Sequence, residues 1–246
     1  MYARLQDEMA KLIDELSVFL PTYNEEKNIT IVVEKVRKIL TNIADKWEII
    51  IVEDGSSDKT PQLADSLVKK YKLNVRVIHH KPNRGYGGAL KSGYSAAKYK
   101  WVAFMDSDDQ FDFFEVENFI RKQKKTGADL VLGIRMRRAD SIVRRLYTFV
   151  WSKLLPRILL GLKVTDYSCG FKLIRKQVFD SVQPLVGEEK VTQIEMLTKA
   201  QRKGYKFAEV GVHHYPRKFG HQTGADLKVI TKSIVDLGKL WWQLRR

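Results

Sequence analysis

WVAFMDSDDQ, residues 101–110, is the segment most informative about the fold, because an apolar run ends there in a cluster of carboxylates. The run WVAFM has the composition of a strand buried on both faces, as found in parallel sheets that helices cover. Asp106 and Asp108 follow it in extended backbone and project to the same side, and Gln110 continues the alternation. Carboxylate and amide oxygens suit a hard cation, so we predict that these three residues bind one Mg²⁺ or Mn²⁺ ion. The alternative is a polar loop whose acidic residues only cap the next helix.

Short apolar runs on either side of this stretch alternate with helical patterns, which predicts an α/β fold with a mostly parallel central sheet flanked by helices. Strands are expected at 16–20, 47–53, 74–79, 101–106, 128–134 and 205–215. Helices are expected at 29–40, 60–68, 86–98 and 190–203, with a basic amphipathic helical region at 140–160. Outside a domain that spans 16–225, we expect an N-terminal helical extension at 1–15 and an amphipathic helix at 226–246.

Two other predicted strands also end in acidic residues, in LPTYNEE (20–26) and IVEDGSSDKT (51–60). In sheets of this kind ligands bind beyond the carboxyl ends of the strands, so Glu25 and Asp54 are expected at the same edge as the metal site. An acceptor such as Asp54 can bind a base N–H or a ribose hydroxyl of a nucleotide. Helix capping accounts for the residues that follow Asp54 but poorly for Asp54 itself.

The composition bounds the partners and the compartment. The formal charge of +15 and a pI near 9.7 predict an anionic partner, such as nucleic acid, a phosphorylated substrate or acidic lipid. Cys169 is the single cysteine, which excludes an internal disulfide and fits a reducing, cytosolic compartment. Residues 1–15 lack the apolar core of a secretory signal, and the most apolar stretch, 149–164, is broken by charges and a proline. Any membrane contact is therefore expected to be peripheral.

Four segments occur in an order that resembles the inverting family 2 glycosyltransferases of the GT-A fold, namely LPTYNEE, VEDGSSDKT, NRGYGGA (83–89) and DSDDQ. Within that family, dolichyl-phosphate mannose synthases and polyprenyl-phosphate glucose synthases are similar at DYSCGFKLIRK (166–176), QIEM (193–196) and RKFGHQTG (217–224). The resemblance covers about residues 16–225 and identifies that span with a catalytic domain. Two positions depart from the family's pattern: Glu53 replaces the first Asp of an Asp-Asp-Gly-Ser segment, and Thr223 comes one residue later than a loop Ser.

The resemblance implies a site residue by residue. The nucleotide sugar is bound by Pro21, Tyr23, Glu25, Asp54 and Asp106, and the metal by Asp106, Asp108 and Gln110. The residues implied in catalysis are Asp108, Arg217 and Glu195. Arg217 lies on a mobile loop that approaches the phosphates. Glu195 orients Arg217 or the acceptor, at a position where other branches of the family have a catalytic base. The acceptor phosphate is bound by Arg135, Arg144 and Arg145.

The resemblance also implies an inverting, metal-dependent hexosyltransferase that uses a nucleoside-diphosphate sugar of the GDP-mannose or UDP-glucose type. Its acceptor would be a polyprenyl or dolichyl phosphate, and its product a lipid monophosphosugar. Since a phosphate oxygen is already anionic, the acceptor needs cations rather than a general base, and the basic, aromatic-rich residues 135–157 fit that need. Catalysis is then expected at the cytoplasmic face of a membrane, with the chain bound peripherally or through a membrane-anchoring partner protein.

Two other functions stay open. A family 2 enzyme of polysaccharide or glycoprotein assembly would use the same donor and metal with a hydroxyl acceptor. A non-enzymatic basic module would bind nucleic acid or an anionic membrane, but it leaves the acidic strand ends unexplained, so no nucleic-acid partner is expected. For residues 135–157 the alternative is a solvated helix that packs on the core.

Overall fold

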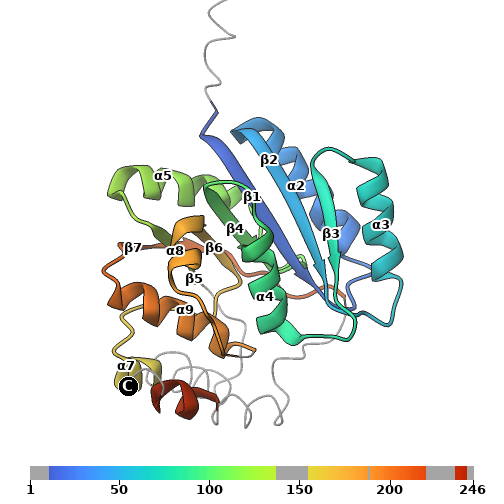
Figure 1. The fold of residues 1–246 in the computed structure, drawn as a ribbon. Helices are drawn as coiled ribbons and strands as arrows, with labels where there is room; N and C mark the ends of the chain where they lie inside the picture. The colour runs from blue at the N-terminus through green and yellow to red at the C-terminus, as the bar shows by residue number, and fades with distance from the viewer. Residues whose placement is uncertain (1–10, 137–154, 188, 220–235, 243–246) are drawn as a thin grey trace, which may run out of the picture.

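The computed structural model describes residues 11–136, 155–187, 189–219 and 236–242. Its strands are β1 (Ile13–Thr22), β2 (Ala44–Glu53), β3 (Val75–His79), β4 (Trp101–Met105), β5 (Leu130–Arg135), β6 (Phe171–Arg175) and β7 (Phe207–Val212). They form one sheet in the order β3-β2-β1-β4-β6-β5-β7 (Figure 1). β1 to β4 run parallel, β5 and β7 are parallel to each other, and β6 pairs antiparallel with β4 and β5. The prediction of a mostly parallel sheet is confirmed.

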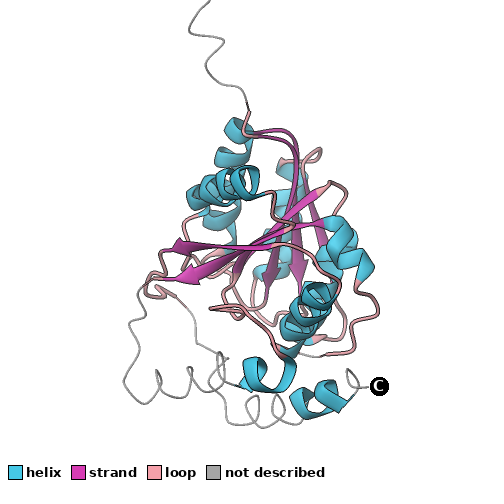
Figure 2. Ribbon diagram, turned by 90° about the vertical axis from the view of Figure 1, so that its left-hand side faces the viewer, coloured by secondary structure: helices cyan, strands magenta, loops and turns pink. Residues whose placement is uncertain are grey.

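Helices cover both faces of the sheet, as Figures 1 and 2 show. They are α2 (Ile29–Ile43), α3 (Thr60–Lys70), α4 (Gly85–Ala96), the 3-10 helix η1 (Phe113–Glu115), α5 (Val116–Thr126), α7 (Leu155–Leu160), α8 (Lys176–Ser181) and α9 (Val191–Arg202). Side chains alternate between the two faces along β1. Val18 therefore packs in the core that α2 and α5 cover, whereas Phe19 lies in the core under α4, with its ring centroid 4.7 Å from that of Tyr94.

Two parts of the sheet differ from the sequence-based expectation. β1 begins at Ile13, so the expected helical extension is wrong for residues 13–15, and residues 1–10 lie outside the described part. The sequence pattern does not predict β6, because Lys172 and Arg175 interrupt its apolar run. Lys172 is nevertheless fully buried. A charged residue inside a strand therefore points to a polar network in the core rather than to a surface.

The two amphipathic segments are described in part. Of the region 140–160 the structure describes α7 at its end, and of the segment 226–246 it describes a helix at 236–242. Leu237 and Leu240 are buried in the same core as residues of α4 and α9, so the domain holds one face of this helix. In the described ranges, no helix is both long and apolar enough to span a bilayer.

Candidate active site

Three neighbouring parallel strands deliver acidic residues to one edge of the sheet. β1 lies between β2 and β4, and Thr22 at its end is in register with Glu53. The segments that follow the strands are also joined, since Asp54 N donates to Thr22 O at 2.9 Å and Ser107 Oγ donates to Pro21 O at 2.8 Å. As expected, the parallel topology places at one edge the side chains of Glu25, Asp54, Asp106 and Asp108.

Asp106 and Asp108 form a partly buried pair of like charges. Tyr86 Oη donates to Asp106 Oδ1 at 2.9 Å, and Gln110 N donates to Asp108 Oδ1 at 3.2 Å. Burial, and then the charge of Asp108, raises the pKa of Asp106 to about 7, and burial raises the pKa of Asp108 as well. Gly170 packs so closely that a Cβ there would lie 1.9 Å from Asp106 Oδ2. The raised pKa values mean that the surroundings disfavour the charged form of both carboxylates, a condition that a bound cation relieves.

These residues fit half of a divalent-metal site. Asp106 and Asp108 supply two carboxylates, and in the described part of the chain no group of three or more His, Cys, Asp or Glu side chains could hold a metal ion. The remaining ligands would be water and substrate phosphates, as is usual for Mg²⁺. Gln110 is buried, and its Nε2 donates to Tyr215 O at 2.8 Å, so the segment after β7 holds its amide. Its role as a third ligand stays a prediction.

Arg217 reaches the acidic edge from the segment after β7. Its Nη2 donates to Glu25 Oε1, and its Nη1 lies 3.8 Å from Asp108 Oδ2. Nε donates to Phe219 O at 2.6 Å, so the guanidinium has partners on three nitrogens. Burial raises the pKa of Glu25, and hydrogen bonds from Asn28 and Arg217 partly offset that rise. The cation that the sequence predicts near the phosphates therefore lies next to Asp108.

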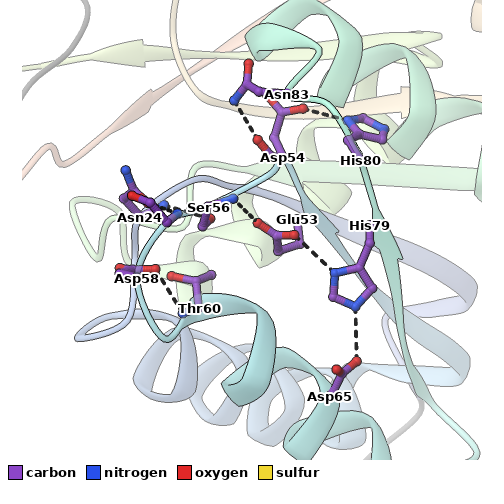
Figure 3. Close-up of polar contacts among 11 residues, drawn as sticks. Asn24, Glu53, Asp54, Ser56, Asp58, Thr60, Asp65, His79, His80 and Asn83 are labelled. Atoms are coloured by element: carbon purple, nitrogen blue, oxygen red, sulfur yellow. Dashed lines mark hydrogen bonds and ion pairs between the residues drawn. The ribbon is translucent and has the colours of Figure 1, made fainter.

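The carboxyl ends of β2 and β3 carry a second polar cluster, which Figure 3 shows. Asp54 Oδ1 accepts hydrogen bonds from His80 Nδ1 at 2.6 Å and from Arg84 N at 2.9 Å. Asn83 Nδ2 donates to Asp54 O at 2.5 Å. Glu53 Oε1 accepts from Ser56 N at 2.6 Å, so the buried Glu53 side chain closes the turn that follows β2. Asp54 is thus held at the sheet edge by the loop after β3.

Pro21 and Tyr23 lie where β1 ends. Pro21 is within the strand, and its carbonyl accepts the hydrogen bond from Ser107. Tyr23 follows the strand with a side chain that is 44% exposed. The next residue, Asn24, donates its N–H to Ser56 Oγ at 2.9 Å. An exposed ring beside the Asp54 loop is in a place where it could stack on a base.

Arg135, at the end of β5, forms an ion pair with Asp166. Its Nε and Nη2 each donate to Asp166 at 2.8 Å, and Nη2 also donates to Ser168 Oγ at 2.7 Å. Its charge is one of those that lower the pKa of Asp106, so Arg135 belongs to the same electrostatic site. Arg144 and Arg145 lie outside the described residues.

The sequence analysis missed a buried chain of polar side chains behind Asp106. Gln193 Nε2 donates to Tyr86 Oη at 3.2 Å, and Lys172 Nζ donates to Gln193 Oε1 at 2.5 Å. Lys172 Nζ also lies 5.0 Å from the ring centroid of Phe104, and burial lowers its pKa to about 8. The chain supports Asp106 from inside the core. The one signal for it in the sequence is a lysine within an otherwise apolar strand.

Glu195 faces a loop and its own helix. Its Oε2 accepts from Val186 N at 2.9 Å and from Gly187 N at 2.6 Å, and its Oε1 lies 2.6 Å from Lys199 Nζ. These contacts hold the loop before α9, while Arg217 pairs instead with Glu25 and Asp108. A catalytic part for Glu195 stays a prediction.

Comparisons with known proteins agree on one family. The sequence model described as Glycosyl transferase family 2 matches residues 17–183. Dodecaprenyl-phosphate galacturonate synthase of Rhizobium johnstonii is 31% identical over 71% of this chain and 51% of its own length. Dolichyl-phosphate beta-glucosyltransferase of Dictyostelium discoideum is 31% identical over 80% of this chain and 65% of its own length. The chain thus spans less than two thirds of the length of these two relatives.

A solved structure has the same fold. Glucosyl-3-phosphoglycerate synthase from Mycobacterium tuberculosis, in complex with Mn²⁺, uridine-diphosphate and glucosyl-3-phosphoglycerate, matches with a TM-score of 0.65. The match has 22% sequence identity and covers 92% of this chain and 80% of that chain. The likeness shows a shared arrangement of sheet and helices.

Proposed function

This chain belongs to glycosyl transferase family 2 and has the GT-A fold, and from that premise we propose that it moves a hexose from a nucleoside-diphosphate sugar to a polyprenyl or dolichyl phosphate. The transfer inverts the configuration of the sugar and yields a lipid monophosphosugar. In this proposal residues 16–225 form the catalytic domain, and the donor lies at the edge where β1, β2 and β4 end.

One observation carries the proposal: a partly buried carboxylate pair, Asp106 and Asp108, and an arginine paired with Asp108 lie at the same sheet edge as Asp54. A nucleoside-diphosphate sugar needs an acceptor for its base or ribose and positive charge for its two phosphates. Asp54 offers the acceptor, and Arg217 and a metal ion on Asp106 and Asp108 offer the charge. A module that only binds nucleic acid or membrane needs none of these groups and has no reason to withdraw two neighbouring carboxylates partly from water.

The chemistry divides among a few residues. When bound, Mg²⁺ or Mn²⁺ would offset the negative charge of the departing diphosphate. Asp106 and Asp108 would hold that ion, and Tyr86 orients Asp106 through its hydrogen bond. Arg217, which here neutralises Glu25 and Asp108, has the forked donor geometry that phosphate oxygens accept. The acceptor phosphate supplies its own anionic oxygen, so no side chain has to remove a proton from it.

The acceptor rests on the two relatives, whose names refer to dodecaprenyl phosphate and dolichyl phosphate. Arg135 is the described cation proposed for the acceptor phosphate, and Arg144 and Arg145 are proposed with it. We place the reaction at the cytoplasmic face of a membrane, reached through the amphipathic segments or an anchoring partner. Ile158 of α7 is 67% exposed and Trp242 is 57% exposed, which suits contact with a lipid interface.

A transfer assay tests the proposal. The protein is incubated with labelled UDP- and GDP-sugars, Mg²⁺ or Mn²⁺ and a short polyprenyl phosphate, and label is measured in the organic phase. Labelled lipid that requires both the lipid phosphate and the metal supports the proposal. Transfer to a hydroxyl acceptor without lipid phosphate would support the polysaccharide or glycoprotein alternative instead.

A matched pair of variants on one loop tests the metal assignment. Asp108→Asn should lower the rate at least about 100-fold, because it removes charge at the place where diphosphate charge develops. Asp112→Asn is the control, since Asp112 Oδ1 only caps Phe114 N at 3.0 Å and an asparagine oxygen can do the same. Equal rates for wild type and Asp108→Asn would remove the metal from the proposal.

A further inference from the structure

Two consecutive histidines at the end of β3 pair with two consecutive acids at the end of β2. Glu53 is in register with His79, and because successive strand residues face opposite ways, the next pair lies on the other face. His79 binds Glu53 Oε2 at 3.1 Å and Asp65 Oδ1 of α3 at 3.0 Å, with 30% of its side chain exposed. His80 has only 3% of its side chain exposed and binds Asp54 (Figure 3). The two histidines therefore have separate surroundings.

His80 is held at both ring nitrogens. Nδ1 lies 2.6 Å from Asp54 Oδ1, and Nε2 lies 2.9 Å from Ser92 Oγ of α4. A carboxylate oxygen accepts hydrogen bonds, so Nδ1 carries a hydrogen and donates it to Asp54, while Nε2 bonds to the serine hydroxyl. The ring is thereby locked against Asp54 by a helix on one side and a strand end on the other.

The two carboxylate oxygens of Asp54 differ in the number of hydrogen bonds that they accept. Oδ1 takes a hydrogen bond from His80 Nδ1 and a second from Arg84 N, which matches its two lone pairs. Oδ2 has no hydrogen bond to any residue in the described part of the chain, although the Asp54 side chain is only 5% exposed. Asp54 therefore presents a single free acceptor oxygen to a ligand.

A single acceptor oxygen distinguishes nucleobases. In a uridine nucleotide N1 carries the ribose, so the uracil has one ring N–H, at N3 between two carbonyl groups, and one acceptor oxygen satisfies it. Guanine presents parallel N–H bonds at N1 and N2, which match a carboxylate that offers two oxygens. With Oδ1 occupied, one guanine donor would be buried without a partner, and an unsatisfied donor costs more than a hydrogen bond adds.

We propose that His80, by occupying Oδ1 of Asp54 together with Arg84 N, makes this site select a uridine over a guanosine nucleotide. The inference rests on the proposed function, in which Asp54 binds the base. It assigns the donor as a UDP-sugar, and it makes His80 a positioning residue that acts through Asp54 and never touches the nucleotide itself.

Calorimetric titration with UDP and with GDP, in the presence of Mg²⁺, tests the inference. Wild type should bind UDP at least about tenfold more tightly than GDP. His80→Leu removes one of the two donors to Oδ1, so that oxygen can accept one hydrogen bond from guanine while Arg84 N stays bonded to it, and the ratio of the two dissociation constants should shrink about tenfold. His80→Asn is the rescue variant, because the asparagine amide can donate from the position of Nδ1, and it should keep the wild-type ratio.

Two further variants serve as a control and as a second test of the role of His80. His79→Asn is the matched control, since His79 contacts Glu53 and Asp65 but not Asp54, and its ratio should stay at the wild-type value. Ser92→Ala removes the hydrogen bond at Nε2 of His80 and should shrink the ratio of the two dissociation constants, as His80→Leu does. It tests the same role if His80→Leu does not fold. Circular dichroism establishes that each variant is folded.

A failure of the proposed function and a failure of the inference about His80 give different results. If wild type binds neither nucleotide and transfers no sugar, the proposed function is wrong. If wild type binds both nucleotides equally, or if folded His80→Leu and Ser92→Ala keep the wild-type preference, the proposed function stands and the role of His80 is wrong.

Discussion

Replacing Gly170 by alanine tests the placement of Asp106 without touching a charged group. The new Cβ would lie 1.9 Å from Asp106 Oδ2 and 2.4 Å from its Cγ. Non-bonded atoms do not approach so closely, so the carboxylate must shift by about 1 Å. The φ angle of Gly170 is not positive, so alanine brings no backbone strain of its own. A displacement of this size at a catalytic group costs roughly 100-fold in rate.

The assay is the rate of lipid-phosphate glycosylation at saturating substrates, with the Mn²⁺ dependence of that rate as a second readout. Gly170→Ala should lower the rate roughly 100-fold and weaken the response to Mn²⁺. Gly238→Ala is the control, because a Cβ added there would have no heavy atom within 4 Å and residues 236–242 are helical. A folded Gly170→Ala enzyme with the wild-type rate and metal response would refute the contact between Gly170 and Asp106.

Three other substitutions test the core and the site. Burial lowers the pKa of Lys172 from 10.5 to about 8, so between these pH values the unfolded chain binds more protons than the folded one. The free energy of unfolding of the wild type should therefore rise with pH across this range, by about 3 kcal/mol in all. Urea unfolding from pH 7 to 10 should show this rise in the wild type and not in Lys172→Met. Gly93→Ala places a Cβ 2.2 Å from the ring of Phe19 and should destabilise the fold by about 1–3 kcal/mol, measured by urea unfolding, and unchanged stability would contradict that packing. Arg217→Lys keeps the charge but loses the fork that spans Glu25 and Asp108, so kcat should fall at least about tenfold in steady-state assays, and a wild-type kcat would show that charge alone suffices.

Local sequence pattern predicts the strands other than β6 and the acidic residues that follow β1, β2 and β4. The run at 101–105 becomes β4, and the alternation after it places Asp106 and Asp108 at one sheet edge. These predictions work because strand alternation and the position of ligands beyond parallel strands depend on a few consecutive residues and on the topology that they imply. Glu53 is an instructive case, since the residue that departs from the family's pattern closes the turn with its own carboxylate.

The same reasoning did not predict the support behind these residues. His80 is buried and holds Asp54 from 26 positions away along the chain. Tyr86 meets Gln193 across 107 positions, and nothing in the spacing of the two residues indicates that contact. Side chains so far apart in sequence are brought together only when helices pack on the sheet.

Short-range features of the sequence specify the class of fold, the strands other than β6 and the acidic residues that follow three of them, because hydrophobic period and backbone alternation are local properties. The folded structure alone establishes which oxygen of Asp54 is free, which side chain orients Asp106 and where the guanidinium of Arg217 lies. Those features depend on contacts between residues far apart in the chain, and their energies depend on burial, which exists only once the sheet and its two layers of helices have closed around them.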